Sequence, residues 1–381
     1  MKLSKKWLSV VAMSALVLGA CGDGGGSSSS ATADGSASGE QQSLTFNASS
    51  GVNDKHFWHR GFFQPLMDSV DEETGGKVSF NAFTSGELVG LGTEYDALTN
   101  GTIDVALTLM APYDPQRFPY TEVVMLPLLE SDSTIAAEAM KAMMNSDQEI
   151  KDGKTYYQIE FEDKGLVAFA NSPTQPYVIS TTNKAFDEVG DFSRDVRMRT
   201  ASRVHEILST NLGITSQSMP ITDAYDALSR NALDGFFYNV PDWMAFGFDE
   251  LIKHTIEGAN FGHFVGHTAM TEETWAKLTP ETQDIFRSNA ERLIVEGSQL
   301  TKDETEENRQ SNIDKGGEFK HLSEVPEDVR VHIEAAITKT WLDWIENLES
   351  QGHAGKEIAI LWRDSLVEAG AEVPQEVMDI K

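Results

Sequence analysis

Short apolar runs and stretches of helical spacing alternate over most of the chain. SLTFNASSG places Leu44 and Phe46 on one side of an extended segment, which predicts a strand that ends at a turn of small residues. The next stretch has apolar residues at helical spacing and reaches Gly75 and Gly76, which predicts a helix that stops there. KVSFNAF predicts a second strand, TEYDALTNG a short helix, and IDVALTLM a strand buried on both faces. We therefore expect a β-α-β-α-β lobe over residues 44–168.

The same order of elements recurs further along the chain. LVAFANS and PYVISTTN predict strands, DVRMRT predicts another, and SRVHEILSTNLG predicts a helix that stops at Gly213. ITSQSMP, TDAYDALSRNALDG and GFFYNV then predict a strand, a helix and a strand. Helices dominate the remainder, and one of them is expected to start at Thr279 and Pro280.

These patterns predict two lobes of α/β structure. We expect the second lobe over residues 169–263, a return to the first lobe over residues 264–300, and helices over residues 301–381 that pack on the second lobe. Two such lobes present the carboxyl ends of their strands to a shared cleft, where ligands usually bind. The organisation is typical of a ligand trap or of an enzyme with a site between its lobes.

The N-terminal residues predict export and lipid attachment. Lys2, Lys5 and Lys6 precede an apolar run over residues 7–20 that is too short to span a bilayer comfortably. The run ends in LGAC, which resembles a bacterial lipobox, and Cys21 is the only cysteine of the chain. We expect a lipoprotein signal peptide over residues 1–20 and lipidation of Cys21, which would hold the protein at a membrane surface.

The alternative is an ordinary signal peptide that happens to contain a cysteine. Residues 21–43 are rich in Gly and Ser and predict a flexible tether. With a single cysteine, an intramolecular disulfide is impossible.

The charge of the chain excludes one class of partner. Sixty acidic residues against thirty basic ones give a formal net charge of −30. Nucleic-acid binding needs a basic surface, so we expect no nucleic acid as a partner. The acidic balance suits a protein kept soluble in salty surroundings, and it suggests a marine or halophilic source. An anionic ligand would need a local cation in its site.

Candidate catalytic groups are few. The pairs His56 with His59 and His263 with His267 have spacings that could hold zinc on a helix, but neither pair has an obvious third ligand. We interpret such histidines as polar cleft or surface residues. No Gly-x-Ser-x-Gly elbow occurs in the sequence, and the only cysteine lies at the lipobox. We therefore expect no enzymatic activity, no cofactor and no metal.

RDVRMRTAS contains the most specific chemical signal. In a strand, Arg197 and Arg199 point to the same face, and Val196 and Met198 point to the other. The planar guanidinium pairs bidentately with a carboxylate, so a cleft arginine is suited to an organic acid. The alternative is a salt bridge to one of the many acidic residues.

Four motifs, in order, resemble the substrate-binding proteins of tripartite ATP-independent periplasmic (TRAP) transporters. They are TGGKV followed by SGEL and GTID, then DFSRDVRMRTAS, then DAYDALSRNALDG, then WAKLTPETQDIF. The resemblance runs from about residue 44 to about residue 300. It implies a periplasmic-binding-protein-like fold with hinge strands that cross between the lobes. It also places Arg199 at the carboxylate-clamping arginine of the family.

Two departures from the family pattern concern the ligand. Many members have an Asn after the Asp-Gly pair, and here Asn239 fits only with one inserted residue. Many acid-sugar binders carry a second Arg before the linker, where FANSPTQPY offers Asn171 and Gln175. The missing charge argues against a dicarboxylate or a sialate.

The resemblance implies a lipid-anchored extracytoplasmic receptor that binds a small organic acid. It would pass the acid to two membrane subunits of the transporter, a small one of four spans and a large one of twelve. The expected ligand-binding residues are Arg199, Asn239, Asn171, Gln175, Trp58, Tyr113, Phe237, Trp243 and His263. A zwitterionic compatible solute such as ectoine is an alternative ligand. A cleft hydrolase or lyase is a less favoured alternative function.

Overall fold

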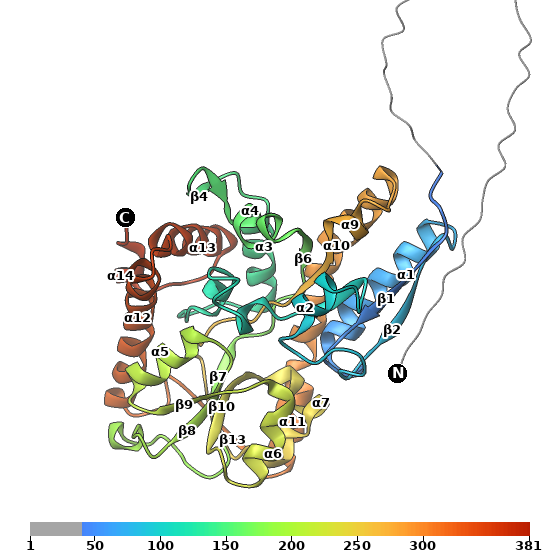
Figure 1. Cartoon of the computed structure of the whole chain (residues 1–381). Coiled ribbons are helices and arrows are strands. Elements are labelled where there is room, and N and C mark those ends of the chain that lie inside the picture. The colour runs from blue at the N-terminus through green and yellow to red at the C-terminus, as the bar shows by residue number, and fades with distance from the viewer. Residues whose placement is uncertain (1–39) are drawn as a thin grey trace, which may run out of the picture. The chain divides into compact units, whose positions relative to one another are not determined.

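The computed structural model describes residues 40–381, and most of its strands form two sheets, one in each lobe (Figure 1). The sheet of the first lobe has the spatial order β2-β1-β3-β12-β6. β1 runs parallel to both neighbours, whereas β12 runs antiparallel to β3 and β6. These strands are β1 (Leu44–Ser49), β2 (Val78–Phe83), β3 (Val105–Leu109), β6 (Leu166–Ala170) and β12 (His267–Thr271). All residues of β3 are buried, which confirms the prediction from its continuous apolar run.

The sheet of the second lobe has the order β13-β11-β7-β10-β8-β9. β7 runs antiparallel to both of its neighbours, and the other pairs are parallel. Its strands are β7 (Tyr177–Thr181), β8 (Arg197–Thr200), β9 (Thr215–Ser218), β10 (Gly235–Asn239), β11 (His254–Glu257) and β13 (Glu318–His321). The expected class, two lobes of mixed α/β structure, is confirmed.

Two segments cross between the sheets, and we call residues 171–176 and residues 258–266 the hinge segments. They lead from β6 to β7 and from β11 back to β12, so each connects one lobe to the other. Backbone hydrogen bonds join them side by side: Asn171 N donates to Gly266 O at 2.9 Å, and Thr174 N donates to Phe264 O at 3.0 Å. The two crossings therefore form a paired ribbon, which limits how the lobes can move relative to each other.

Local sequence signals set the ends of the main helices. Thr279 caps α10 (Pro280–Asp303) by accepting from Thr282 N, and Pro280 occupies the first helical position, as predicted. α5 (Arg203–Leu212) ends at Gly213, whose φ of 87° is left-handed, so the predicted stop is confirmed. The other long helices of the first lobe are α1 (Gln64–Glu73) and α3 (Ser133–Met144).

The C-terminal helices pack on both lobes, which corrects the expectation that residues 301–381 pack on the second lobe alone. α11 (Thr305–Asp314) and α12 (Glu327–Ser350) lie against the second lobe, with α12 along α5, whereas α13 (Gly355–Ala369) lies along α3 of the first. The helical pattern revealed the apolar faces of these helices but not which lobe would cover them.

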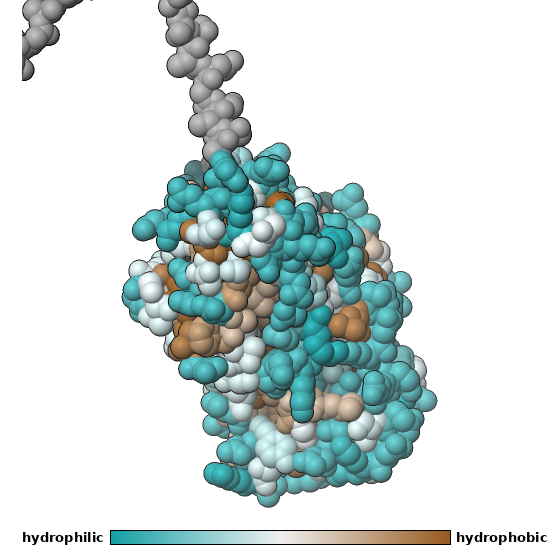
Figure 2. All heavy atoms as spheres, turned by 90° about the vertical axis from the view of Figure 1, so that its right-hand side faces the viewer, coloured by the Kyte–Doolittle hydropathy of each residue, from teal (hydrophilic) through white to brown (hydrophobic). Residues whose placement is uncertain are grey.

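The remaining elements are short. They are β4 (Glu149–Lys151), β5 (Lys154–Thr155), α2 (Glu94–Thr99), α4 (Tyr156–Glu160), α6 (Ala224–Ser229), α7 (Trp243–Phe246), α8 (Phe248–Leu251), α9 (Glu272–Trp275) and α14 (Gln375–Met378), with η1 (His59–Phe63), η2 (Ala111–Tyr113), η3 (Thr121–Met125), η4 (Glu162–Lys164), η5 (Val189–Asp191), η6 (Ile221–Asp223) and η7 (Val240–Asp242) as tighter or wider helical turns. Within residues 40–381, none of the helices combines the length and the apolar character needed to cross a membrane. Figure 2 shows one face of the molecule, on which hydrophilic residues predominate and apolar ones gather only in small separate patches. The predicted signal peptide, Cys21 and most of the tether lie outside the described residues.

Glu160, at the end of α4, is a fully buried carboxyl group of the first lobe. Its Oε2 accepts a hydrogen bond from Thr121 N at 3.2 Å, and its Oε1 has no partner among residues 40–381. Burial raises the pKa of Glu160 to about 8, whereas its value in the unfolded chain is near 4.5. The folded protein therefore keeps a proton that the unfolded chain releases. The resulting stabilisation is complete below the unfolded pKa and is lost as the pH rises through the folded one.

We predict that Glu160→Gln removes this pH dependence, because an amide does not ionise. Between about pH 5 and about pH 8.5, the wild type should lose free energy of unfolding relative to the variant, on the order of several kcal/mol. Urea unfolding at both pH values measures the difference. Glu162→Gln, at an exposed position two residues away, is the matched control and should follow the wild type. Parallel behaviour of the wild type and Glu160→Gln would contradict the prediction.

Candidate ligand cleft

A narrow cavity lies where both lobes meet the hinge segments, and its free volume is about 20 Å³. This space is far smaller than a typical small-molecule site, so a ligand would need the lobes to separate. Its walls are Val52, His56, Trp58, Met110, Tyr113, Thr174, Tyr177, Ile221, Tyr238, Asp242 and Phe264. A larger hollow lies along β6, but only residues of the first lobe and its returning segment line it. Residues of both lobes also line a second hollow, which includes Tyr113, Ser202 and Met219. The cavity beside the hinge segments is the candidate site, because buried aromatic side chains of both lobes and the carboxylate of Asp242 meet there.

Aromatic rings form much of the cavity wall. Tyr113 meets Phe264 edge to face with ring centroids 5.7 Å apart, and Tyr177 stacks on the other side of Phe264 at 6.5 Å. Tyr177 also contacts Tyr238 at 5.4 Å. Trp58 packs on Phe264 and donates its indole N–H to Ser172 O at 2.7 Å, which ties this wall to a hinge segment. Such a lining suits a ligand with a flat or apolar body.

Arg199 brings a cation to this wall from β8. Its side chain is completely buried, its Nε donates to Met219 O at 2.9 Å, and its Nη2 donates to the hydroxyl of Tyr113 at 2.9 Å. Nη1 is buried and has no hydrogen-bond partner in the described part of the chain. No carboxylate of residues 40–381 lies within ion-pair distance of Arg199. A buried charge without a counter-charge is costly, and an anionic ligand would supply what is missing.

Arg197, two residues earlier on the same strand, forms an ion pair and is partly exposed. Its Nε pairs with Asp234 Oδ2 at 2.9 Å, and its Nη2 donates to Asn231 O at 2.8 Å. About two fifths of its side chain is exposed (41%). The salt-bridge alternative therefore describes Arg197, whereas Arg199 has no such partner.

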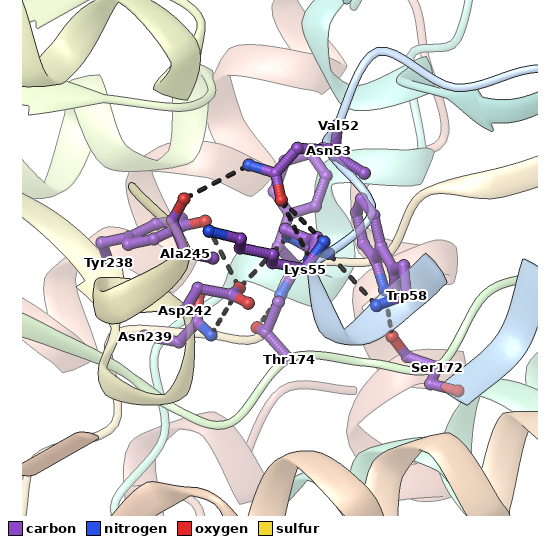
Figure 3. A network of polar contacts seen from close by, with 12 residues as sticks. Val52, Asn53, Lys55, Trp58, Ser172, Thr174, Tyr238, Asn239, Asp242 and Ala245 are labelled. Atoms are coloured by element: carbon purple, nitrogen blue, oxygen red, sulfur yellow. Dashed lines mark hydrogen bonds and ion pairs between the residues drawn. The ribbon is translucent and has the colours of Figure 1, made fainter. Parts of the chain in front are cut away.

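Asp242 brings an anion to the same cavity. Its Oδ2 accepts from the side-chain amide of Asn239 at 2.9 Å and from the Tyr238 hydroxyl at 3.3 Å, as Figure 3 shows. The Nε2 atom of His56 lies 3.3 Å from the same oxygen. Asp242 is only 1% exposed. It is the last residue of η7, directly after β10, so the end of this strand sets its position.

The tyrosines between the two charges are strongly affected by burial. Burial raises the pKa of Tyr177 well above its usual value, and the nearby charges of Arg199 and Asp242 act on it in opposite directions. The same holds for Tyr238, whose pKa is raised first by burial and then by Asp242. Both phenols therefore stay protonated and can donate or accept hydrogen bonds in the cavity.

The structure places two of the expected site residues on the cavity and a third beside it. Trp58 and Tyr113 line it, and Asn239 lies behind it with Oδ1 buried and unpartnered in the described chain. Arg199 reaches the wall through Tyr113. These four residues come from both lobes, so the cleft brings them together only when the lobes are as close as here.

Three expected residues lie in the hinge region, where their side chains form hydrogen bonds within the protein. The amide of Asn171 donates to Leu107 O and accepts from the Thr268 hydroxyl, and Gln175 donates to the Ser133 hydroxyl at 3.0 Å. His263 is buried between Thr174 O, Ser131 and Asn260. Burial lowers the pKa of His263 to about 4, so it is neutral at physiological pH. None of the three lines the cavity.

Two expected aromatic residues lie in the core of the second lobe instead of the cleft. Phe237 packs on His205 and Phe261, and Trp243 stacks on Phe319 with centroids 5.7 Å apart. Side chains alternate along β10, so Tyr238 faces the cavity and Phe237 faces the other side of the sheet.

Sequence reasoning missed several residues of the cavity. They are His56, Tyr177, Tyr238, Asp242 and Phe264. The one available signal was the NVPDW segment, where a carboxylate follows directly on a buried strand end. Among the described residues, no group of three or more His, Cys, Asp or Glu side chains is arranged to hold a metal ion.

Known proteins resemble this chain in sequence and in structure. A family model described as "Bacterial extracellular solute-binding protein, family 7" matches residues 48–346. The C4-dicarboxylate-binding protein DctB of Bacillus subtilis is 23% identical over 301 residues, which cover 74% of each chain.

Two solved TRAP solute-binding proteins have a similar structure. One, from a marine metagenome and specific for aromatic acid ligands, has a TM-score of 0.75 at 19% identity over 86% of this chain and 99% of its own. The other, from Bordetella bronchiseptica with bound mandelate, has a TM-score of 0.73 at 18% identity over 85% and 99%. At these identities the structural likeness shows the shared fold.

The positions of two tryptophans lead to a prediction. Trp58 lines the cavity and Trp243 lies in the core. A carboxylic acid that binds in the cleft should change the fluorescence of Trp58, so Trp58→Phe should lose most of the change that the wild type shows on titration. Trp243→Phe is the control and should keep it. If the signal disappears in Trp243→Phe and persists in Trp58→Phe, the acid binds elsewhere.

Proposed function

The chain belongs to family 7 of the bacterial extracellular solute-binding proteins, and on this premise we propose that it is a TRAP receptor that clamps the carboxylate of a small organic acid with Arg199. The family and the similar structures are transport solute-binding proteins, which argues for binding and against catalysis. The observation that carries the proposal is the buried Nη1 of Arg199, which has no partner among the described residues.

The ligands named for similar proteins support an acid. DctB is named for C4-dicarboxylates, and the solved structures hold metahydroxyphenylacetate, mandelate, galacturonate or orotic acid. All of these carry a carboxylate, and several carry a ring. The aromatic wall of this cavity favours an acid with a flat or apolar body over a sugar acid.

Closure of the lobes is the second part of the proposal. Tyr113 belongs to the first lobe and Arg199 to the second, so their hydrogen bond forms only when the lobes approach. A ligand carboxylate on Nη1 would add a contact at the same place and favour the closed form. Closure also removes water, which strengthens the attraction between the carboxylate and the guanidinium. The closed receptor would then deliver the acid to the small and large membrane subunits of the transporter.

We predict that Arg199→Ala weakens acid binding by roughly thirty-fold to several thousand-fold. Truncating one partner of a buried charge pair costs about 2–5 kcal/mol, and about 1.4 kcal/mol corresponds to a tenfold change. Arg199→Lys keeps the charge but loses the planar fork, so it should recover only part of the affinity. A thermal-shift screen with succinate, mandelate and 3-hydroxybenzoate identifies a binding acid, and calorimetry then measures the affinity of each variant.

Arg197→Ala is the matched control on the same strand. Its guanidinium is paired with Asp234 and partly exposed, so its loss should change the affinity by less than about threefold. If Arg199→Ala binds the acid within threefold of the wild type, Arg199 is not in the site and the acid-binding proposal fails.

The lipid anchor is a separate part of the proposal. Cys21→Ser cannot accept a diacylglycerol, so we predict that the variant moves from the membrane fraction to the soluble fraction of cells. Its affinity for the acid should be unchanged, since the cleft lies within residues 40–381. Continued fractionation with membranes would refute lipidation at Cys21.

A further inference from the structure

We infer that Asp242 forms a second, anionic subsite, and that the ligand carries a cationic group, such as an ammonium or an amidinium, together with its carboxylate. The inference rests on the proposed function, because it assigns the other end of a molecule whose carboxylate binds Arg199. It concerns the same cavity, whose wall includes Asp242.

The hydrogen bonds of Asp242 are concentrated on one of its two oxygens. Oδ2 accepts from Asn239 and Tyr238 and lies 3.3 Å from the imidazole of His56. Oδ1 accepts no hydrogen bond from residues 40–381, although the side chain is almost completely buried. Three groups therefore orient the carboxylate and leave its second oxygen to the cavity, where a ligand donor can reach it.

None of the three groups brings a full positive charge. The amide of Asn239 and the phenol of Tyr238 are neutral donors. Trp58 N donates to His56 Nδ1 at 3.1 Å, so Nδ1 is the acceptor nitrogen of this ring. The N–H that faces Asp242 Oδ2 is then on Nε2, 3.3 Å away. Asp242 consequently has these hydrogen bonds, and no Lys or Arg side chain of residues 40–381 lies within ion-pair distance of it.

Asp242 thus lines the cavity, Arg199 lies behind its wall in contact with Tyr113, and the two charges are not paired with each other. Arg199 is held by neutral acceptors, Met219 O and the Tyr113 hydroxyl, and Asp242 by neutral donors. Arg199 contacts Tyr113, Asp242 contacts Tyr238, and both tyrosines line the cavity, so the two charges lie beside the same aromatic wall. A simple anion would compensate Arg199 and leave Asp242 as a repulsive neighbour. A zwitterion would compensate both, at no net charge.

The charge of the whole protein agrees with this assignment. A formal net charge of −30 repels an anion on approach but exerts little net force on a zwitterion. A hydroxyl group of the ligand could also donate to Oδ1. It would leave the buried negative charge of Asp242 uncompensated, so we expect the cationic ligand to bind more tightly.

Two matched series of acids test the inference. The first is phenylglycine, mandelate and phenylacetate, which differ only in an ammonium, a hydroxyl or a hydrogen on one carbon. The second is 3-(aminomethyl)benzoate, 3-(hydroxymethyl)benzoate and 3-methylbenzoate, which moves the same three groups farther from the carboxylate. We expect the wild type to bind the ammonium member of at least one series about tenfold or more tightly than its hydroxyl and hydrogen analogues. Calorimetry measures each affinity.

Asp242→Asn removes the charge and keeps the size of the side chain. We expect it to lose the preference for the ammonium member and to bind the simple acid at least as well as the wild type does. Asp249→Asn is the control, because Asp249 is also a buried aspartate of the second lobe but pairs with Lys315 away from the cavity. It should keep the selectivity of the wild type. Thermal unfolding of each ligand-free variant verifies its folding.

The outcomes separate this inference from the proposed function. If the wild type binds simple acids or hydroxy acids as tightly as their ammonium analogues, the anionic subsite is wrong and the acid receptor stands. The same conclusion follows if Asp242→Asn keeps an ammonium preference. If no acid of either series binds and the succinate and 3-hydroxybenzoate screen is also empty, the receptor proposal fails and the subsite fails with it. The comparison in the wild type decides even where Asp242→Asn does not fold.

Discussion

Burial of charge without a counter-charge is the constraint on which the cleft depends. Arg199 is completely enclosed, yet its partners within the described chain are a backbone carbonyl and a phenol. A guanidinium in this state costs free energy that the fold must supply elsewhere. The rest of the architecture makes this burial possible: the two lobes meet at Tyr113 and Arg199, and aromatic rings form the wall between them.

The hinge region satisfies the opposite requirement, since it contains polar groups but no unpaired charge. The hinge segments are joined by backbone hydrogen bonds, and His263 links them to neighbouring residues through both ring nitrogens. Its pKa of about 4 keeps the ring neutral, so opening and closing of the lobes involves no titration there at physiological pH. The hinge segments contain no Asp, Glu, Lys or Arg, so no charge there opposes movement of the lobes.

The sequence predicts the helices and strands more accurately than it predicts which elements pack against one another. The end of α5 at Gly213 and the start of α10 after Thr279 depend on local geometry, so a few residues are enough to predict them. Which lobe covers α13 depends on long-range packing, and the apolar pattern contains no information on it. The family motif predicts Arg199 as the clamping residue, but the sequence does not reveal which face of β10 points to the cavity. The prediction of Phe237 as a cleft residue is wrong, since Tyr238 faces the cavity. The side chains of a strand point alternately to its two faces, and the packing of the strand against its neighbours decides which face is directed to the cavity.

Asp242 shows why single motifs underdetermine a ligand. One departure from the family pattern is the missing second arginine. By itself it indicates only that the ligand carries less negative charge than a dicarboxylate. The structure adds a buried carboxylate in the cavity wall, and on this basis we propose a site that carries both signs of charge. The inserted residue before Asn239 fits this view, because Asn239 now donates to Asp242 and orients it. In the receptor that we propose, specificity would depend on how Arg199 and Asp242 are spaced along one aromatic wall, and less on either residue alone.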